Sequence, residues 1–272
     1  MALRRHPASL HSVFERTFHE HRRSVLGWST GLLLLAVVMA AVYPTVRDNP
    51  ALATLHETYP KALRSLFDIT DLTTGVGFMR AEVFSLVAPA LLIVMAVLWG
   101  GDLIAGEEDR GTIDILLANP VSRRRVLLEK WAALVVGVAA SGAALAVGLA
   151  VAVSPARLHI TAAGVAAAVV SVVVLALLFG TVALAVGAAT GRRGVARGVA
   201  AVLAVVAYLV SSLGDLIGWI KAIRPASPWY HALGVDPLAK GFSLPHLAVP
   251  IGLTLVVMAI ALYAFDRRDL AV

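Results

Sequence analysis

Six long apolar segments constrain the fold of this chain more than any other feature of its sequence. A helix needs about 20 apolar residues to cross about 30 Å of hydrocarbon, because each backbone polar group must be satisfied within the segment. Charged residues make up only 15% of the chain, against about a quarter in soluble domains. We therefore predict an all-α integral membrane protein. Its six transmembrane helices are predicted at Val25–Tyr43, Val83–Leu103, Trp131–Val153, Ile160–Ala189, Val199–Ile220 and Leu247–Phe265.

The positive charges predict the orientation of these helices. Fifteen of the 23 lysines and arginines lie on the side of the N-terminus and the even-numbered connections, so that side is predicted to be cytoplasmic. This topology accounts for the net charge of +6, and no nucleic-acid partner is needed to explain it. The first apolar segment is too long for a secretory leader and is predicted to remain in the protein.

The predicted organisation has three parts. Residues 1–24 form a cytoplasmic N-terminus, residues 25–265 the six-span transmembrane domain, and residues 266–272 a cytoplasmic C-terminus. Within the transmembrane domain, residues 45–82 and 221–246 are predicted to be external. Residues 104–130 are predicted to form a cytoplasmic loop.

Shorter segments carry patterns that leave alternatives open. Apolar residues at helical spacing before the first span predict a short amphipathic helix in the cytoplasmic interface, with a solvated tail as the alternative. These residues are Leu10, Val13, Phe14 and Phe18. In the first external segment, residues 51–59 and 61–67 also show helical spacing, so this segment forms either a compact cap or a loop. Two small-xxx-small pairs, Gly27 with Gly31 and Gly187 with Gly191, indicate either a dimer seam or a chance match in a chain rich in Ala and Gly.

The sequence contains no pattern for catalysis by the chain alone. It has no phosphate-binding G-x-x-x-x-G-K-[ST] loop, no H-E-x-x-H metal helix and no G-x-S-x-G nucleophile turn. The N-terminal histidines lack the spacing and carboxylate partner of a metal site, so we predict neither a metal nor a catalytic residue. The spans also hold few charged residues near their centres, whereas transporters driven by ion gradients usually bury such groups there. The energy for any transport is therefore expected to come from another source.

The longest cytoplasmic connection is the polar run from Gly106 to Arg125. Within it, Ile113, Leu116 and Leu117 share one face of a short helix, which Pro120 ends because the residue before a proline avoids the α region. Gly111 permits a sharp entry into this helix. A helix of this length is unstable alone in water, so we expect it to pack against another protein or against its own subunit.

Ser122 is predicted to be the N-cap of the helix that continues into the third span. The three arginines that follow, Arg123, Arg124 and Arg125, oppose the helix dipole. They therefore indicate an anionic partner, such as lipid head groups or an acidic protein. Alternatively, they serve only to keep this end of the span on the cytoplasmic side.

The same run resembles the signature of the ABC-2 type permeases, the membrane subunits of ABC exporters. The matching positions are Glu107, Glu108, Gly111, Thr112, Ile113, Asp114, Leu116, Leu117, Pro120, Ser122 and Arg123. The place of the motif between the second and third spans, the six-span count and the Phe265-Asp266-Arg267-Arg268-Asp269-Leu270 ending are also similar to this family.

The resemblance implies a coupling helix that sits in a cleft of a separate ATPase subunit. Ile113, Leu116 and Leu117 would form its buried ridge, and Gly111 and Pro120 its bends. The polar rim would be formed by Glu107, Glu108, Asp114 and Arg123. The resemblance further implies a pair of permease halves, expected to be a homodimer, with two ATPase subunits that hold ATP and Mg; this chain itself would carry no cofactor.

The leading hypothesis is therefore a permease of an ATP-driven exporter in a prokaryotic plasma membrane, with both termini cytoplasmic. The apolar spans indicate a hydrophobic or amphipathic substrate, and Tyr208, Ser211 and Ser212 are the residues expected to face its pathway. A secondary transporter or channel is one alternative. A non-transporting membrane anchor for a cytoplasmic ATPase is another, and membrane lipids are expected partners in every case.

Overall fold

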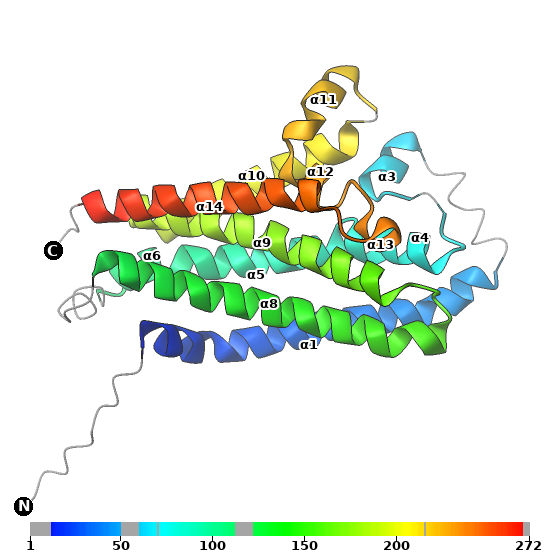
Figure 1. Ribbon diagram of the computed structural model, residues 1–272, viewed down its shortest axis with the longest axis horizontal. Helices are drawn as coiled ribbons and strands as arrows, with labels where there is room; N and C mark the ends of the chain where they lie inside the picture. The colour runs from blue at the N-terminus through cyan, green and yellow to red at the C-terminus, as the bar shows by residue number, and fades with distance from the viewer. Residues whose placement is uncertain (1–11, 50–59, 70, 112–121, 215, 269–272) are drawn as a thin grey trace, which may run out of the picture.

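Six helices in the described part of the chain are long and apolar enough to cross a membrane, which confirms the predicted fold class. The computed structural model describes residues 12–49, 60–69, 71–111, 122–214 and 216–268. The six helices are α1 (Val13–Arg47), the combined segment Gly75–Asp102, α8 (Arg123–Ala156), α9 (Ala162–Thr190), α10 (Arg193–Leu213) and α14 (Leu244–Arg267). α1 begins and α14 ends at the same end of the bundle, which we call the termini end (Figure 1).

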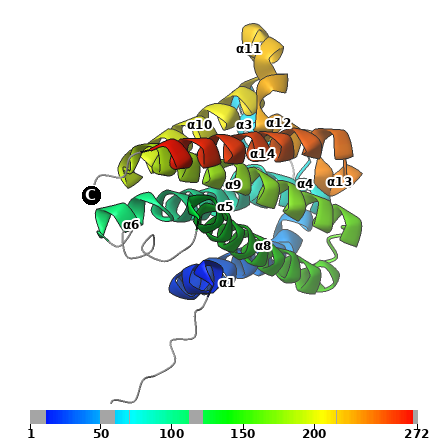
Figure 2. The same cartoon turned by 60° about the vertical axis from the view of Figure 1, so that its left-hand side comes forward.

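α9 occupies the centre of the bundle, with α5 (Val87–Asp102), α8, α10 and α14 packed around it (Figure 2). Small residues allow the closest of these contacts. A Cβ atom built on Gly100 of α5 would lie 2.1 Å from the carbonyl oxygen of Gly180 in α9, so the two backbones touch directly. Such close approach is the usual way in which membrane helices gain packing energy.

The two predicted small-residue pairs differ in their surroundings. No atom lies within 4 Å of a Cβ built on Gly27 or Gly31, so this face of α1 is open in the single subunit and its use as a dimer seam stays a prediction. A Cβ built on Gly187 would lie 3.6 Å from the Cβ of Ala105, within the same chain. The second pair therefore serves packing inside the subunit.

The second span consists of three elements in sequence. These are α4 (Gly75–Met79), the π-helix η1 (Arg80–Phe84) and α5. The backbone N–H of Ser85 donates to the carbonyl oxygen of Arg80 at 2.7 Å, the five-residue spacing of a π-helix. The helical segment therefore starts at Gly75, inside the stretch 45–82 that was predicted to be external.

The predicted end of the fifth span is wrong. The prediction continued this span to Ile220, whereas α10 ends at Leu213 and a separate helix, α11 (Gly218–Ile223), projects from the bundle (Figure 1). Side chains from other elements bind carbonyl groups in the last turns of α10. Ser227 donates to the carbonyl of Ala207 at 2.7 Å, and Ser65 donates to that of Ser212. Gly214 directly follows this end, a residue common after helices, and the prediction did not use that signal.

The predicted amphipathic helix and the first span form one continuous helix. α1 begins at Val13, and the side chain of Ser12 accepts a hydrogen bond from the backbone N–H of Glu15 as its N-cap. No break separates residues 13–24 from the first span. The location of residues 13–24 in the membrane interface stays a prediction.

Several short helices gather at the end opposite the termini, which we call the cap end (Figure 1). They are α3 (Lys61–Leu66), α11, the 3₁₀-helix η2 (Arg224–Ala226), α12 (Pro228–Ala232) and α13 (Pro237–Lys240). α3 confirms the helix predicted at 61–67, while the piece at 51–59 lies outside the described residues. The hydroxyl of Tyr208 in α10 donates to the carbonyl of Leu66 at 2.7 Å and so holds α3 against the bundle.

Candidate functional site

At the termini end, a five-residue helix, α6 (Ala105–Asp109), follows α5 and carries three consecutive acidic residues. Glu107 forms an ion pair with Lys130 of α8 at 2.5 Å. Lys130 is 3% exposed and Glu107 is 9% exposed, so this pair is buried. Asp109 forms a more exposed pair with Arg193 of α10 at 2.9 Å. The first and third acids thus connect α6 to two different spans.

The second acid connects α6 to the end of the last span. Glu108 pairs with Arg268, directly after α14, at 2.8 Å. Arg268 also donates to the carbonyl of Ala188 in α9 at 3.2 Å, and its own carbonyl accepts a hydrogen bond from Arg123 of α8 at 2.7 Å. Elements far apart in the sequence therefore meet at this one arginine.

The start of α8 is fixed by contacts within the subunit. The side chain of Ser122 accepts a hydrogen bond from the backbone N–H of Arg125, which confirms the predicted N-cap. Arg124 pairs with Asp266 of α14, and Arg125 pairs with Glu129 at 2.8 Å. The arginines that oppose the helix dipole therefore have acidic or carbonyl partners in the same chain. The sequence analysis missed the partners of Arg123 and Arg124, because no local pattern links residues more than 140 positions apart. It also missed Glu129, although an i,i+4 pair with Arg125 is a local pattern.

The loop between α6 and α8 holds most of the predicted coupling residues. Thr112, Ile113, Asp114, Leu116, Leu117 and Pro120 lie outside the described residues. Gly111 has a φ of +65°, a left-handed conformation that permits the sharp entry predicted there. Glu107, Glu108 and Arg123 contact other parts of their own subunit. Their place on a polar rim facing the ATPase, which the resemblance implies, stays a prediction.

A groove of about 270 Å³ runs between α5 and α10. Its lining side chains are Leu86, Ala90, Ile93, Val94, Val97, Leu98, Arg197, Ala201, Ala204, Val205, Tyr208 and Trp229. Arg197 forms an ion pair with Asp102, at the end of α5, at 2.8 Å. Tyr208 lies toward the cap end, where its ring packs edge-on against that of Trp229 with 5.0 Å between the ring centroids. The surface that lines the groove is therefore apolar, with the Arg197–Asp102 ion pair beside one end and the Tyr208–Trp229 contact at the other.

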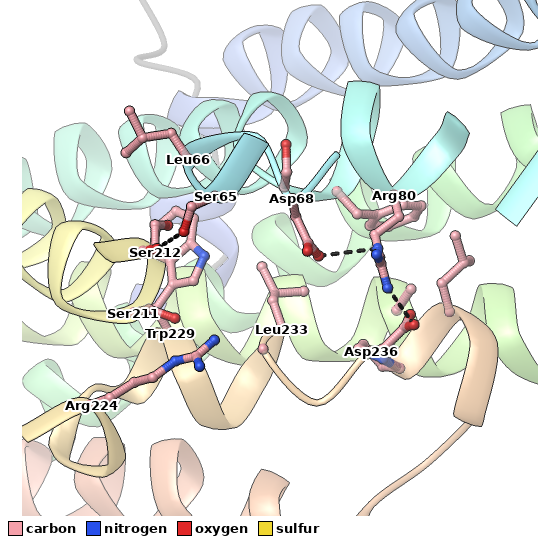
Figure 3. A pocket seen from close by; sticks show the side chains of 16 residues that line it. Ser65, Leu66, Asp68, Arg80, Ser211, Ser212, Arg224, Trp229, Leu233 and Asp236 are labelled. Carbon is pink, nitrogen blue, oxygen red and sulfur yellow. Dashed lines mark hydrogen bonds and ion pairs between the residues drawn. The ribbon is translucent and has the colours of Figure 1, made fainter. Parts of the chain in front are cut away.

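A polar cavity of about 110 Å³ lies at the cap end (Figure 3). Arg80 of the π-helix bridges two acids in its wall, binding Asp68 at 3.1 Å and Asp236 at 2.6 Å. Trp229 lines both this cavity and the groove. Of the residues predicted to face a pathway, Tyr208 lines the groove, whereas Ser211 and Ser212 line the polar cavity.

Comparison with known families agrees with this architecture. Residues 11–270 match the family described as ABC-2 family transporter protein. The chain belongs to the ABC-2 transporter family. ABC-2 permeases are membrane transport subunits that normally work with an ATPase subunit and are generally not catalytic themselves. No curated protein matches the chain.

Proposed function

We propose that this ABC-2 protein is the permease subunit of an ATP-driven exporter and that it forms the pathway for an amphipathic substrate. Two permease subunits, expected to be identical, would assemble with two ATPase subunits that hold ATP and Mg. The complex would lie in a prokaryotic plasma membrane with both termini in the cytoplasm.

The observation that carries this proposal is the direct connection between the loop and the groove. The loop that resembles a coupling helix follows α6, and α6 follows α5, which forms one wall of the groove. Asp102 at the end of α5 pairs with Arg197 on the opposite wall. A displacement of the loop by an ATPase would therefore act on both walls through covalent and ionic connections.

The two neighbouring cavities favour an amphipathic substrate over a purely hydrophobic one. The groove offers apolar side chains of α5 and α10, as a hydrocarbon chain requires. The cavity at the cap end offers hydroxyl groups and charged side chains, as a polar head group requires. Trp229 lines both the groove and the polar cavity. One molecule with a hydrocarbon chain and a polar head group could therefore contact the two surfaces at the same time.

Reconstitution with the cognate ATPase tests this function. We expect ATP-dependent movement of a fluorescent amphiphile across proteoliposomes, and we expect the Leu116→Asp/Leu117→Asp variant to lose both ATPase binding and transport. Leu63→Asp is the matched control, because Leu63 is a half-exposed apolar residue of α3 at the opposite end of the bundle.

Other outcomes identify the alternatives. Transport that survives ATP depletion but collapses with the ion gradient would show a secondary transporter or channel. ATPase binding without any substrate movement would show a membrane anchor. Full ATP-driven transport by the double aspartate variant would refute the coupling role of the loop.

A further inference from the structure

We infer that Arg268 and Glu108 are positioning residues for energy coupling, which make the ends of α9 and α14 move together with α6. This inference rests on the proposed function, since it assumes that an ATPase displaces the loop attached to α6. It adds a second route from the loop, separate from the direct one through α5. Its basis is the ion pair between Glu108 and Arg268 and the contacts around that pair.

Arg268 is suited to join several helices because its donors point to different elements. One terminal nitrogen, Nη2, binds Glu108 of α6, and the other, Nη1, donates to the carbonyl of Ala188 near the end of α9. The side chains of Glu108 and Arg268 are only 15% and 20% exposed, so water competes weakly for these contacts. Arg268 itself follows the last residue of α14.

Gly191 provides the space for this ion pair. It is the C-cap of α9 with a φ of +66°, a conformation that disfavours other residues. A Cβ built there would lie 1.9 Å from the Oε2 atom of Glu108 and 2.2 Å from the Nη2 atom of Arg268. Any larger residue at position 191 would therefore displace the pair, so the end of α9 is shaped around it.

The position of α6 depends on its ion pairs, because a helix of five residues has almost no stability of its own. The buried pair between Glu107 and Lys130 holds α6 against α8 and secures the fold. The pair between Glu108 and Arg268 is less buried and reaches α9 and the chain after α14. Loss of the Glu108–Arg268 pair should therefore leave the subunit folded and able to bind the ATPase. The ends of α9 and α14 would then no longer move together with α6.

The test measures substrate molecules moved per ATP hydrolysed in proteoliposomes that contain the permease and its ATPase. We expect Arg268→Gln and Glu108→Gln each to lower this ratio roughly tenfold, a typical size for coupling between sites. The exchanged pair, Glu108→Arg with Arg268→Glu, should raise the ratio back toward wild type. Arg16→Gln is the control, because it breaks an exposed ion pair with Glu20 within α1 at the same end and should leave the ratio unchanged.

A distance measurement tests the inference without the ATPase. The chain has no cysteine, so spin labels attach at Arg110→Cys and Arg267→Cys alone. Diluting labelled with excess unlabelled subunits restricts the measurement to the separation between the end of α6 and the end of α14 within one subunit. We expect Arg268→Gln to broaden this distance distribution, and Arg16→Gln to leave it unchanged. An unchanged distribution, or a wild-type transport ratio in both single variants, would overturn the inference. A wild-type permease that binds no ATPase would instead refute the proposed function.

Discussion

The buried ion pair between Glu107 and Lys130 gives the sharpest stability prediction. Both side chains lie between α6 and α8 with almost no exposure, so each charge depends on the other in place of water. Removing one partner of a buried pair leaves an uncompensated charge and typically costs about 3–5 kcal/mol. We therefore expect Lys130→Met, and equally Glu107→Leu, to lower the free energy of unfolding by about 3–5 kcal/mol.

A variant that replaces both Glu107 and Lys130 separates the desolvation cost of the two charges from their mutual attraction. Replacing both partners by apolar residues of similar size is often neutral or stabilising, because the desolvation cost of the two charges disappears with their attraction. Glu107→Leu with Lys130→Met should therefore be more stable than either single variant. Equilibrium unfolding of the purified permease, followed by tryptophan fluorescence, measures all three. Single variants as stable as wild type, or a double variant that shows the sum of both losses, would refute this reasoning.

Three further predictions concern other parts of the molecule. Arg80→Gln removes two ion pairs at the cap end and should speed proteolysis of the segments there, with a loss of about 1–3 kcal/mol in unfolding free energy. Gly100→Val places a side chain against the backbone of Gly180 and should cost at least about 1–3 kcal/mol, measured by the same unfolding assay. Trp229→Ala removes the side chain shared by the groove and the polar cavity, so ATP-driven transport of an amphiphile should fall while ATPase binding stays at wild-type level.

Local patterns were sufficient to predict the spans and one helix cap. Hydropathy located all six helices because a lipid-spanning helix must be apolar over its whole length, and Ser122 was identified because an N-cap needs only residues close in sequence. The same averaging over apolar residues missed the end of α10. Near that end, the hydroxyl groups of Ser65 and Ser227, which come from other elements, bind carbonyl groups of α10.

The ion pairs at the termini end could not be predicted from sequence for a similar reason. Glu108 and Arg268 are 160 positions apart, and each looks like an ordinary charged residue next to a span. Gly191 was noticed only as part of a small-residue pair, although its structural importance is the room it leaves for that ion pair. The resemblance singled out Glu107 and Glu108 for contact with an ATPase, but a motif carries no information about the contacts that they make within their own subunit.

The distribution of polar contacts has a mechanical consequence for the proposed transport. The ion pairs that the structure describes lie at the two ends of the bundle. They fix α6 at the termini end and the short segments at the cap end. Between these ends the groove walls of α5 and α10 meet through apolar side chains, which have no preferred register. Separating these walls would break the contacts that Arg197 makes with Asp102 and with the carbonyl of Leu98 near the termini end. Moving α6 alone would break its ion pairs with α8, with α10 and with the residue after α14. A force on the loop should therefore move α6 and α5 as one body, and the groove is the place where the bundle can open.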